Sequence, residues 1–466
     1  ARATMKLKNV QISNFRCFDS LSIDFDEQLT VLVAENGVGK TAILDAIAIA
    51  HSPFLRGIDA GIGKGFKPED ARLIAQSSPF QPLTPQKVIR KRMEPQFPIA
   101  LTAKGIIDDQ SVEWSRELTG KKTQTTFGKA RILADYAKKL QQLVRNGEQV
   151  ELPIIAYYGT GRLWKQAQPS NKKSIESQSR MYGYRDALNP DATYTLFEKW
   201  FTEASLAEAH YYVSFITSAD MSELWGYKDV SNLPRRSIEL EHVRKAIDQC
   251  LAISGWNALE YNFELRDLVL HHVGNDSDTA YIPVAQLSDG VKAMLSLTAD
   301  IAYRCVQLIP HLASPTEETK GIVLIDEIDL HLHPKWQQTV LVDLCKAFPK
   351  IQFIVTTHSP QVLTTVQAKC IRLLYANGDV VTPEINPYGE ESKVALEDIM
   401  HTSSRPHTDE ADLLQRYLQR INQGDIDSPE VIKWRQILEY AFGSEYSKLK
   451  LADMVISKWK AKRGME

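Results

Sequence analysis

The sequence has 466 residues, enough for two to four domains at roughly 100 to 200 residues each. Hydrophobic residues make up 43% and charged residues 24%, a composition that excludes disordered, collagenous and disulfide-stapled chains. Lys and Arg number 55 against 58 Asp and Glu, so the formal charge of -3 provides no overall attraction to nucleic acid or anionic lipid. Any binding of nucleic acid therefore has to depend on local basic clusters.

Cysteine usage and hydropathy predict a cytoplasmic protein with no membrane association. No apolar run reaches the roughly 18 residues that would span a bilayer. The cysteines are scattered singly, without a Cys-x-x-Cys pair or histidines at zinc-finger spacing, and we expect buried thiols in a reducing compartment. They are Cys17, Cys250, Cys305, Cys345 and Cys370.

The first part of the chain predicts strands that lead into a helix. Alternating apolar and polar residues favour two half-exposed strands within 5–25, and a buried strand follows at 29–33. After Thr41 an apolar stripe of Ile43, Leu44, Ile47 and Ala48 predicts a helix. The pattern then predicts a long irregular segment, a strand region with a turn, an amphipathic helix and a strand, at residues 52–98, 111–127, 129–144 and 152–158.

The second part predicts alternating strands and helices after a mainly helical stretch at 181–250. Strands are expected at 259–265, 268–273, 281–284, 322–325 and 351–356, with a turn at 274–276 and helices at 291–309 and 335–348. This alternation is typical of a largely parallel sheet. Apolar stripes predict three further helices in the tail, at 409–422, 429–442 and 445–460.

A P-loop pattern lies between the buried strand at 29–33 and the helix after Thr41. The sequence Ala34-Glu35-Asn36-Gly37-Val38-Gly39-Lys40-Thr41 fits this pattern except that Ala34 replaces the first glycine. Backbone N–H groups at such a turn surround phosphate oxygens, Lys40 reaches the outer phosphates and Thr41 holds Mg²⁺. The alternative is a glycine-rich turn that ends in Lys-Thr by chance.

Three further elements support the P-loop. The strand at 322–325 is followed by Asp326 and Glu327. The first carboxylate can join the coordination shell of a metal ion, and the second can polarise an attacking water molecule. Ser288 to Gly290 precede a helix and predict a second phosphate-binding helix start. His358 follows the strand at 351–356, where an imidazole can contact a γ-phosphate. Each element alone is weak, since acids and histidines at strand ends are usually turn or capping residues, but their combined order is specific.

These motifs resemble the ABC-type ATPase head of the SMC and RecF families, over residues 5–50 and about 255–375. The resemblance implies that Arg16 lies near the phosphates, that Asp326 binds the metal and that Glu327 is the catalytic carboxylate. It implies that Ser288 and Gly290 act across a dimer, and that Asp329 is the D-loop residue and His358 the switch histidine. It also implies nucleotide contacts from Asn36, Gly37, Val38, Gly39, Lys40 and Thr41. The signature departs from Leu-Ser-Gly-Gly-Gln at Asp289 and Val291, which bears on the hydrolysis rate.

A finer resemblance is to the PtuA-type ATPases of the bacterial Septu system, which also occur beside retrons. It rests on residues 326–334, Thr357-His358-Ser359-Pro360 and Ser403-Ser404-Arg405-Pro406. The family implies ATP and Mg²⁺ as cofactors, a dimer or higher oligomer formed through ATP sites, and a separately encoded HNH nuclease. Nucleic acid, or a retron reverse transcriptase with its DNA, is a further implied partner. We interpret His331 and His333 as structural and expect no metal besides Mg²⁺.

The resulting hypothesis is an α/β protein: an ABC-type P-loop ATPase head with a mostly parallel core sheet, an inserted helical lid and a C-terminal helical module. The expected domains are the two head parts 5–160 and 255–382, the lid 161–254 and the module 383–466. We expect an ATPase without intrinsic nuclease activity, the regulator of a partner nuclease in anti-phage defence. The alternatives are a RecF-like DNA-repair ATPase that loads on DNA and a structural ATP-binding scaffold with little hydrolysis.

Overall fold

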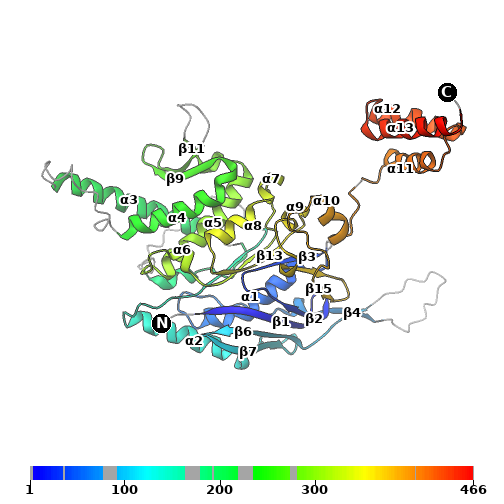
Figure 1. The fold of residues 1–466 in the computed structure, drawn as a ribbon. Helices are drawn as coiled ribbons and strands as arrows, with labels where there is room; N and C mark the ends of the chain where they lie inside the picture. The colour runs from blue at the N-terminus through cyan, green and yellow to red at the C-terminus, as the bar shows by residue number, and fades with distance from the viewer. Residues whose placement is uncertain are drawn as a thin grey trace, which may run out of the picture. The chain divides into compact units, whose positions relative to one another are not determined.

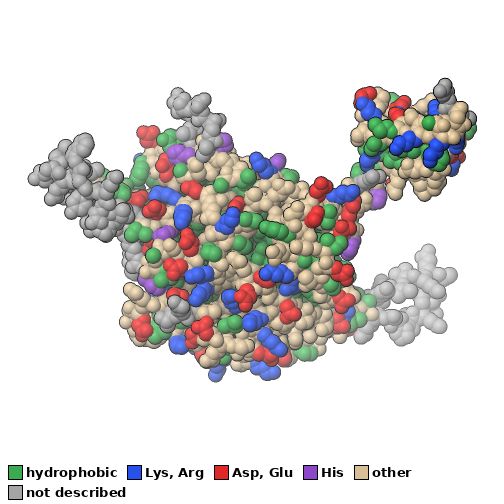
Figure 2. Space-filling view, viewed as in Figure 1, with side chains coloured by type: hydrophobic (Ala, Val, Ile, Leu, Met, Phe, Trp, Pro, Cys, Tyr) green, Lys and Arg blue, Asp and Glu red, His purple; other side chains and the backbone are tan. Residues whose placement is uncertain are grey.

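The structure is a computed structural model that forms two compact units, Ala1–Ala395 and Leu396–Glu466. It describes residues 4–34, 37–76, 92–162, 179–191, 194–218, 235–272, 281–404 and 406–464. No helix among these residues is long and apolar enough to cross a membrane. Figure 2 shows acidic and basic side chains intermingled over the visible face of the first unit, as a net charge near zero predicts.

A six-stranded sheet forms the centre of the first unit. Its order is β15 (Val380–Val381), β14 (Ile371–Leu374), β3 (Leu29–Ala34), β13 (Ile351–Thr356), β12 (Gly321–Ile325) and β8 (Ile154–Tyr158). All neighbouring pairs are parallel except the edge pair of β14 and β15. Every residue of β3, β13, β12 and β8 is buried, because helices or a second sheet cover both faces of the central sheet. The predicted mostly parallel core sheet is confirmed.

A second, antiparallel sheet lies on the other side of helix α1 (Lys40–Arg56). Its order is β2 (Phe18–Asp24), β1 (Met5–Phe15), β6 (Ile99–Ile107) and β7 (Gln110–Leu118). Helix α1 contacts strands of both sheets, and Figure 1 shows it between them. This position explains why nearly all of α1 is buried, whereas the sequence predicted only one apolar stripe.

Helices cover the other face of the central sheet. Helix α5 (Asp289–Leu308) is almost entirely buried and packs against β8 and α4 (Arg235–Leu251). Helix α3 (Thr195–Ser218) packs against α4 and α5, and Figure 1 shows α3 and α4 beside each other. A small antiparallel sheet packs on α4; its order is β11 (Tyr281–Pro283), β10 (Asp267–His272) and β9 (Trp256–Asn262).

The remaining elements of this unit are short except for one helix, α2 (Arg131–Arg145), which packs against α1. The short elements are β4 (Leu73–Gln76), β5 (Arg92–Pro95), α6 (Pro315–Glu318), α7 (Pro334–Gln337), α8 (Val340–Ala347), α9 (Pro360–Leu363) and α10 (Ser392–Val394). Single turns of 3₁₀ helix connect several of them.

Several local predictions were wrong. The helix predicted at 335–348 is two helices, α7 and α8, because the chain leaves helical geometry at Thr339 (φ -123°). The segment predicted as irregular at 52–98 contains the end of α1 and the antiparallel pair β4–β5. The strand region predicted to reach 127 ends at Leu118. The turn predicted at 274–276 lies outside the described residues.

The cysteine prediction was wrong in part. All five thiols are free, and Cys250, Cys305 and Cys370 are buried as expected. Cys17, however, is exposed and Cys345 is only partly buried. Burial raises the pKa of Cys250, Cys305 and Cys345 to about 12, so these thiols remain protonated at neutral pH.

The second unit is a bundle of three helices, α11 (Asp409–Asn422), α12 (Pro429–Phe442) and α13 (Ser447–Lys462). The predicted helices at 409–422 and 429–442 are confirmed, and the third begins two residues later than predicted. Thr408 and Ser428 cap the first two helices by accepting hydrogen bonds from backbone N–H groups. One shared core holds the helices together, formed by Leu414, Tyr417, Ile421, Ile426, Val431, Leu438, Leu449 and Ala452.

Candidate nucleotide-binding site

Two glycines with positive φ lie in the turn between β3 and α1, which carries the P-loop pattern. Gly37 and Gly39 have φ values of 85° and 89°, in the left-handed region that favours glycine. A Cβ on Gly39 would lie 2.5 Å from Sγ of Cys17 and 2.8 Å from the ring of Phe18, so no larger residue fits there. Val38 lies between these glycines. Asn36, predicted to belong to the same loop, lies outside the described residues.

Lys40, the first residue of α1, points back into this loop. Its side chain is buried, and Nζ donates a hydrogen bond of 2.9 Å to the carbonyl oxygen of Ala34. Nζ also lies 2.8 Å from Nε2 of His358. Burial lowers the pKa of Lys40, although the charges of Glu327, Asp326 and Asp329 oppose this effect. Three of the predicted acids therefore act electrostatically on the predicted P-loop lysine.

Thr41 and Asp326 come together although they are 285 positions apart in sequence. The hydroxyl of Thr41 donates a hydrogen bond of 2.6 Å to Oδ2 of Asp326, and the hydroxyl of Thr356 donates one of 2.5 Å to Oδ1. The parallel strands β12 and β13 end side by side, which places Asp326 next to Thr356. The hydroxyl and the carboxylate are hard oxygen donors, and such a pair fits a Mg²⁺ ion.

Glu327 follows Asp326 in a left-handed backbone conformation, with φ of 47°. Its N–H donates a hydrogen bond of 2.7 Å to the hydroxyl oxygen of Thr356. Arg162 holds the other side of this turn, because its guanidinium donates to the carbonyl oxygens of both Asp326 and Glu327. The positive φ, an uncommon conformation for a residue with a side chain, is thus fixed by two neighbouring elements.

Sequence reasoning missed Arg162. It follows β8 in the segment Gly159-Thr160-Gly161-Arg162, and its side chain is buried. Burial lowers its pKa to about 10, while the charges of Asp326, Glu327 and Asp329 act in the opposite direction. The available signal was a glycine-rich turn ending in arginine, directly after an aliphatic strand that pairs in parallel with β12.

Asp329 and His358 are held by contacts within this chain. Oδ1 of Asp329 accepts a hydrogen bond of 2.5 Å from the hydroxyl of Thr357 and one of 3.4 Å from the N–H of His358. This joins the loop after β12 to the loop after β13. His333 accepts a hydrogen bond from the N–H of Lys335 and thereby caps α7, while His331 has a φ of 63°. Within the described residues, no group of three or more His, Cys, Asp and Glu side chains forms a metal cluster.

Ser288 and Gly290 lie at the start of α5, and among the described residues no hydrogen bond joins them to Lys40, Thr41 or Asp326. The side chain of Ser288 is exposed. A Cβ on Gly290 would lie 2.7 Å from the carbonyl oxygen of His331, so this glycine allows α5 to approach the loop after β12 closely. The structure therefore places the signature segment beside the Asp329 loop of its own chain.

Arg16 lies one residue before Cys17, whose Sγ is 3.8 Å from the carbonyl oxygen of Val38 in the P-loop. The guanidinium of Arg16 is held by two carboxylates, Asp45 at 2.6 Å and Asp70 at 3.0 Å. Asp45 also forms an ion pair with Lys64, whose Nζ lies 3.3 Å from Oδ1 of Asp45. Arg16 is thus positioned beside the loop, with its guanidinium fixed to acids of α1 and of the following segment.

Comparisons with known proteins identify the family and several relatives of this chain. The family model described as "AAA domain" matches residues 9–251, and the model described as "AAA ATPase domain" matches residues 165–363. The retron Vc95 probable ATPase of Vibrio cholerae is 28% identical, over 91% of this chain and 85% of that protein. The Septu protein PtuA of Bacillus mycoides is 25% identical, over 76% of this chain and 38% of that protein. The SMC head domain of Thermotoga maritima aligns at 15% identity with a TM-score of 0.41, over 82% of this chain and 100% of that one.

The predicted resemblance to retron and Septu ATPases is confirmed by these relatives. One family model alone spans more than half of the 466 residues. The chain therefore belongs to the AAA-domain family of ATPases.

Proposed function

We propose that this chain is the ATP-hydrolysing subunit of an anti-phage defence complex, in which its nucleotide state regulates a separately encoded nuclease. One observation carries the ATPase part: Lys40, Thr41, Asp326 and Glu327 converge where the P-loop meets the ends of two parallel strands. The relatives named as retron and Septu proteins support the defence part. The chain itself is assigned no nuclease activity.

Nucleotide binding would use the loop of Gly37, Val38 and Gly39 and the first turn of α1. Gly37 borders open space, since nothing lies within 4 Å of a Cβ built on it. Backbone N–H groups at such a helix start are suited to bind phosphate oxygens. The ammonium of Lys40 would exchange its two present contacts, Ala34 and His358, for phosphate oxygens. Asn36 is assigned to the same loop on its place in the motif.

Mg²⁺ would be held by Thr41 and Asp326, whose oxygen atoms already lie 2.6 Å apart. When bound, the ion neutralises charge on the phosphate oxygens during transfer. Asp326 is buried and receives a second hydrogen bond from Thr356, so its free orientations are few. Thr356 therefore positions the metal-binding carboxylate.

Glu327 would orient the attacking water and accept its proton. Its backbone is fixed by Thr356 and Arg162, which sets the direction in which the carboxylate leaves the strand end. His358 would contact the terminal phosphate, since its ring already lies at hydrogen-bond distance from Lys40. Arg16, held between Asp45 and Asp70, would lie beside the phosphates.

A second copy of the chain would complete the site. Ser288 and Gly290 are at the exposed start of α5 and make no hydrogen bond to the P-loop residues of their own chain within the described part. An exposed helix start with a serine is suited to bind phosphate oxygens on a partner. Asp329 accepts a hydrogen bond from the N–H of His358. A dimer contact at the start of α5 would therefore change the surroundings of the switch histidine.

The proposed partner is a separately encoded HNH nuclease, with nucleic acid or a retron reverse transcriptase and its DNA as further components. The C-terminal unit is the proposed docking module, because it has its own core and exposes large side chains such as Tyr440, which is 96% exposed. The proposed kind of partner is based on the relatives, which are named as a retron ATPase and a Septu protein.

The test is a turnover assay combined with reconstitution. Purified protein should hydrolyse ATP in a Mg²⁺-dependent manner, and nuclease activity of the neighbouring gene product should change with the nucleotide supplied. Activity of the nuclease that is the same with ATP, ADP and no nucleotide would reject the regulatory part. Absence of turnover with every partner would favour the structural scaffold.

A further inference from the structure

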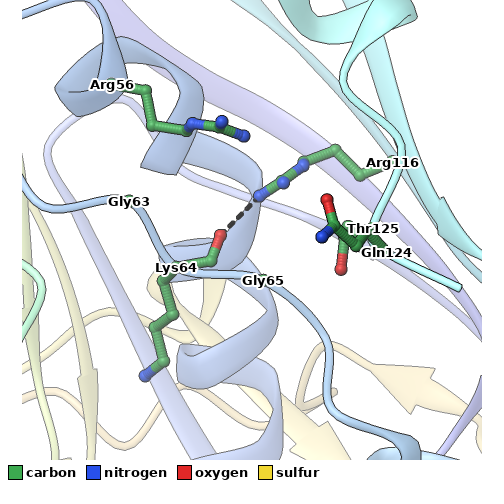
Figure 3. Close-up of a pocket in the computed structure, with 7 residues that line it drawn as sticks. All are labelled: Arg56, Gly63, Lys64, Gly65, Arg116, Gln124 and Thr125. Carbon is green, nitrogen blue, oxygen red and sulfur yellow. Dashed lines mark hydrogen bonds between the residues drawn. The ribbon is translucent and has the colours of Figure 1, made fainter. Parts of the chain in front are cut away.

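A polar pocket of about 270 Å³ lies at the end of α1 that is remote from the P-loop. Its walls are the last residue of α1, the segment that follows this helix, strand β7 and the loop after β7. Figure 3 shows the lining residues Arg56, Gly63, Lys64, Gly65, Arg116, Gln124 and Thr125. The lining contains two guanidinium groups and no carboxylate. Nothing in the proposed ATPase function uses these residues.

Arg116 is a buried cation without an anionic partner among the described residues. Only 2% of its surface is exposed, and its hydrogen bonds all go to carbonyl oxygens: Ile49 at 2.9 Å, Lys64 at 2.6 Å and Thr126 at 3.2 Å. The bond to Ile49 has a structural cause, because Pro53 lacks the N–H that would normally pair with this carbonyl in α1. The positive charge itself remains uncompensated, which is costly for a buried ion.

Arg56 adds a second positive charge to the same pocket. It is exposed, and its guanidinium lies 4.8 Å from the centre of the Phe127 ring, with no ion pair to any described carboxylate. Burial, together with the charge of Arg56, lowers the pKa of Arg116 to about 10. Two guanidinium groups that repel each other at the wall of one cavity would both be stabilised by a shared anion.

Glycines bring the backbone close to these arginines. A Cβ on Gly63 would lie 2.5 and 2.7 Å from the side-chain carbons of Arg56, and one on Gly65 would lie 2.9 Å from Oγ1 of Thr125. The segment that follows α1 therefore passes close to Arg56 and Thr125 only because it lacks side chains at these two positions. Lys64 lies between these two glycines in the sequence, and Figure 3 shows its ammonium directed away from the two arginines.

We propose that this pocket is a second binding site, specific for the phosphate group of a small ligand and separate from the ATP site. Guanidinium groups present planar sets of donors that match phosphate oxygens, and Gln124 adds an uncharged side-chain amide. The volume is just below the roughly 300 to 1,000 Å³ of pockets for drug-sized ligands. It holds inorganic phosphate or a phosphorylated compound of sugar size.

Lys64 connects this pocket to the candidate ATP site. Its carbonyl oxygen accepts the hydrogen bond from Arg116, and its ammonium pairs with Asp45, which also holds Arg16. An anion that changes the position of Arg116 therefore acts on the segment whose side chain contacts the Arg16–Asp45 pair. Helix α1 provides a second connection, since it begins at Lys40 and ends at Arg56.

The proposal is tested by calorimetric titration of the full chain with inorganic phosphate and, separately, with ribose 5-phosphate. The P-loop is first occupied with a non-hydrolysable ATP analogue and Mg²⁺, and a parallel series uses Lys40→Ala without nucleotide. We expect saturable binding in both series, and competition between the two ligands. The tighter ligand identifies the source of the phosphate group. Because the Lys40→Ala series needs no ATP, failure of the proposed ATPase function leaves this test intact.

Three variants decide the result. Arg56→Gln, at an exposed position, should weaken phosphate binding about tenfold or more, because a charged donor is lost. Gly63→Ala should also weaken binding, since the added methyl displaces the stem of Arg56 while the charge stays. The control Arg416→Gln changes an exposed arginine of the C-terminal unit and should have no effect. Absence of binding, equal binding by Arg56→Gln and the control, or binding only to 5′-phosphorylated oligonucleotides would each overturn the proposal.

Discussion

Nζ of Lys40 lies 2.8 Å from Nε2 of His358, a residue 318 positions further along the chain. Nζ of Lys40 also donates a hydrogen bond of 2.9 Å to the carbonyl oxygen of Ala34. Lys40 at the start of α1 and the histidine after β13 are therefore in contact within the proposed nucleotide site.

Lys40→Ala should abolish measurable nucleotide binding. The variant removes the only side-chain cation of the loop, and a hydrogen bond to a charged group contributes roughly 1.5 to 3 kcal/mol. Two lost bonds to phosphate correspond to an affinity at least about a hundredfold lower. Equilibrium binding of a fluorescent ATP analogue measures this directly, with Lys104→Ala, an exposed lysine of β6, as the control. Unchanged affinity would place the nucleotide elsewhere.

Arg162→Ala should destabilise the first unit and slow ATP turnover. The guanidinium donates to the carbonyl oxygens of Gly159, Asp326 and Glu327. Its removal leaves the buried carbonyl of Asp326 without a donor, whereas those of Gly159 and Glu327 keep backbone N–H donors. We expect a loss of roughly 3 kcal/mol in the free energy of unfolding. Thermal denaturation followed by circular dichroism measures it, and Arg131→Ala at an exposed position of α2 is the matched control. Equal melting temperatures would show that Arg162 does not hold this turn.

The sequence predicted the elements whose pattern is local. A buried strand, a glycine turn and a helix are contiguous, so the P-loop around Lys40 was visible at once, and the capped helices α11 and α12 were predicted to the residue. Arg162 was missed because its partners are 164 and 165 positions away. Pairing of this kind depends on the order of strands in the sheet, which the sequence pattern does not specify.

The same reason explains one of the errors around α1. The helix continues through Pro53 because Arg116, from β7, supplies the hydrogen bond that the carbonyl of Ile49 would otherwise lack. Strand β6, which was not predicted, pairs with β1 and β7 and faces α1. A tertiary contact between distant segments thus decided the continuation of α1. Strand β6 does have a local signal, since every second residue from Ile99 to Ile107 is buried, and the sequence reading missed it.

His51→Phe should reduce the acid sensitivity of the first unit. Burial lowers the pKa of His51 to about 4 from 6.5, and its Nε2 has no hydrogen-bond partner among the described residues. Between these two values the unfolded chain binds the proton and the folded chain does not, so stability falls as the pH drops from about 6.5 to 4. The total loss from this group is about 3 kcal/mol.

The variant should therefore lose less stability than the wild type between pH 7 and pH 5. Phenylalanine keeps an aromatic ring against Trp114, whose ring centre lies 5.6 Å from that of His51. Melting temperatures across this pH range provide the measurement. Parallel curves for wild type and variant would mean that His51 does not contribute to the acid sensitivity.

Deletion of the residues after Pro406 should leave a nucleotide-binding protein that no longer retains the proposed nuclease partner. The second unit begins at Leu396 and its helices share a core of their own, so the deletion removes one folded module. Co-purification of the tagged truncated chain with the neighbouring gene product tests this. Tyr440→Ala, at a fully exposed position of α12, asks whether one surface of the module is responsible. Undiminished recovery would move the docking surface to the first unit.

The central claim is that Glu327 acts on a water molecule at the end of β12, and turnover of Glu327→Gln tests it most directly. Glutamine keeps the size and the backbone contacts of Glu327 but cannot accept a proton, so ATP affinity should be retained while phosphate release slows by at least about a hundredfold. The measurement is single-turnover hydrolysis with binding recorded on the same samples. Wild-type rates of phosphate release in Glu327→Gln would contradict the assignment of this carboxylate.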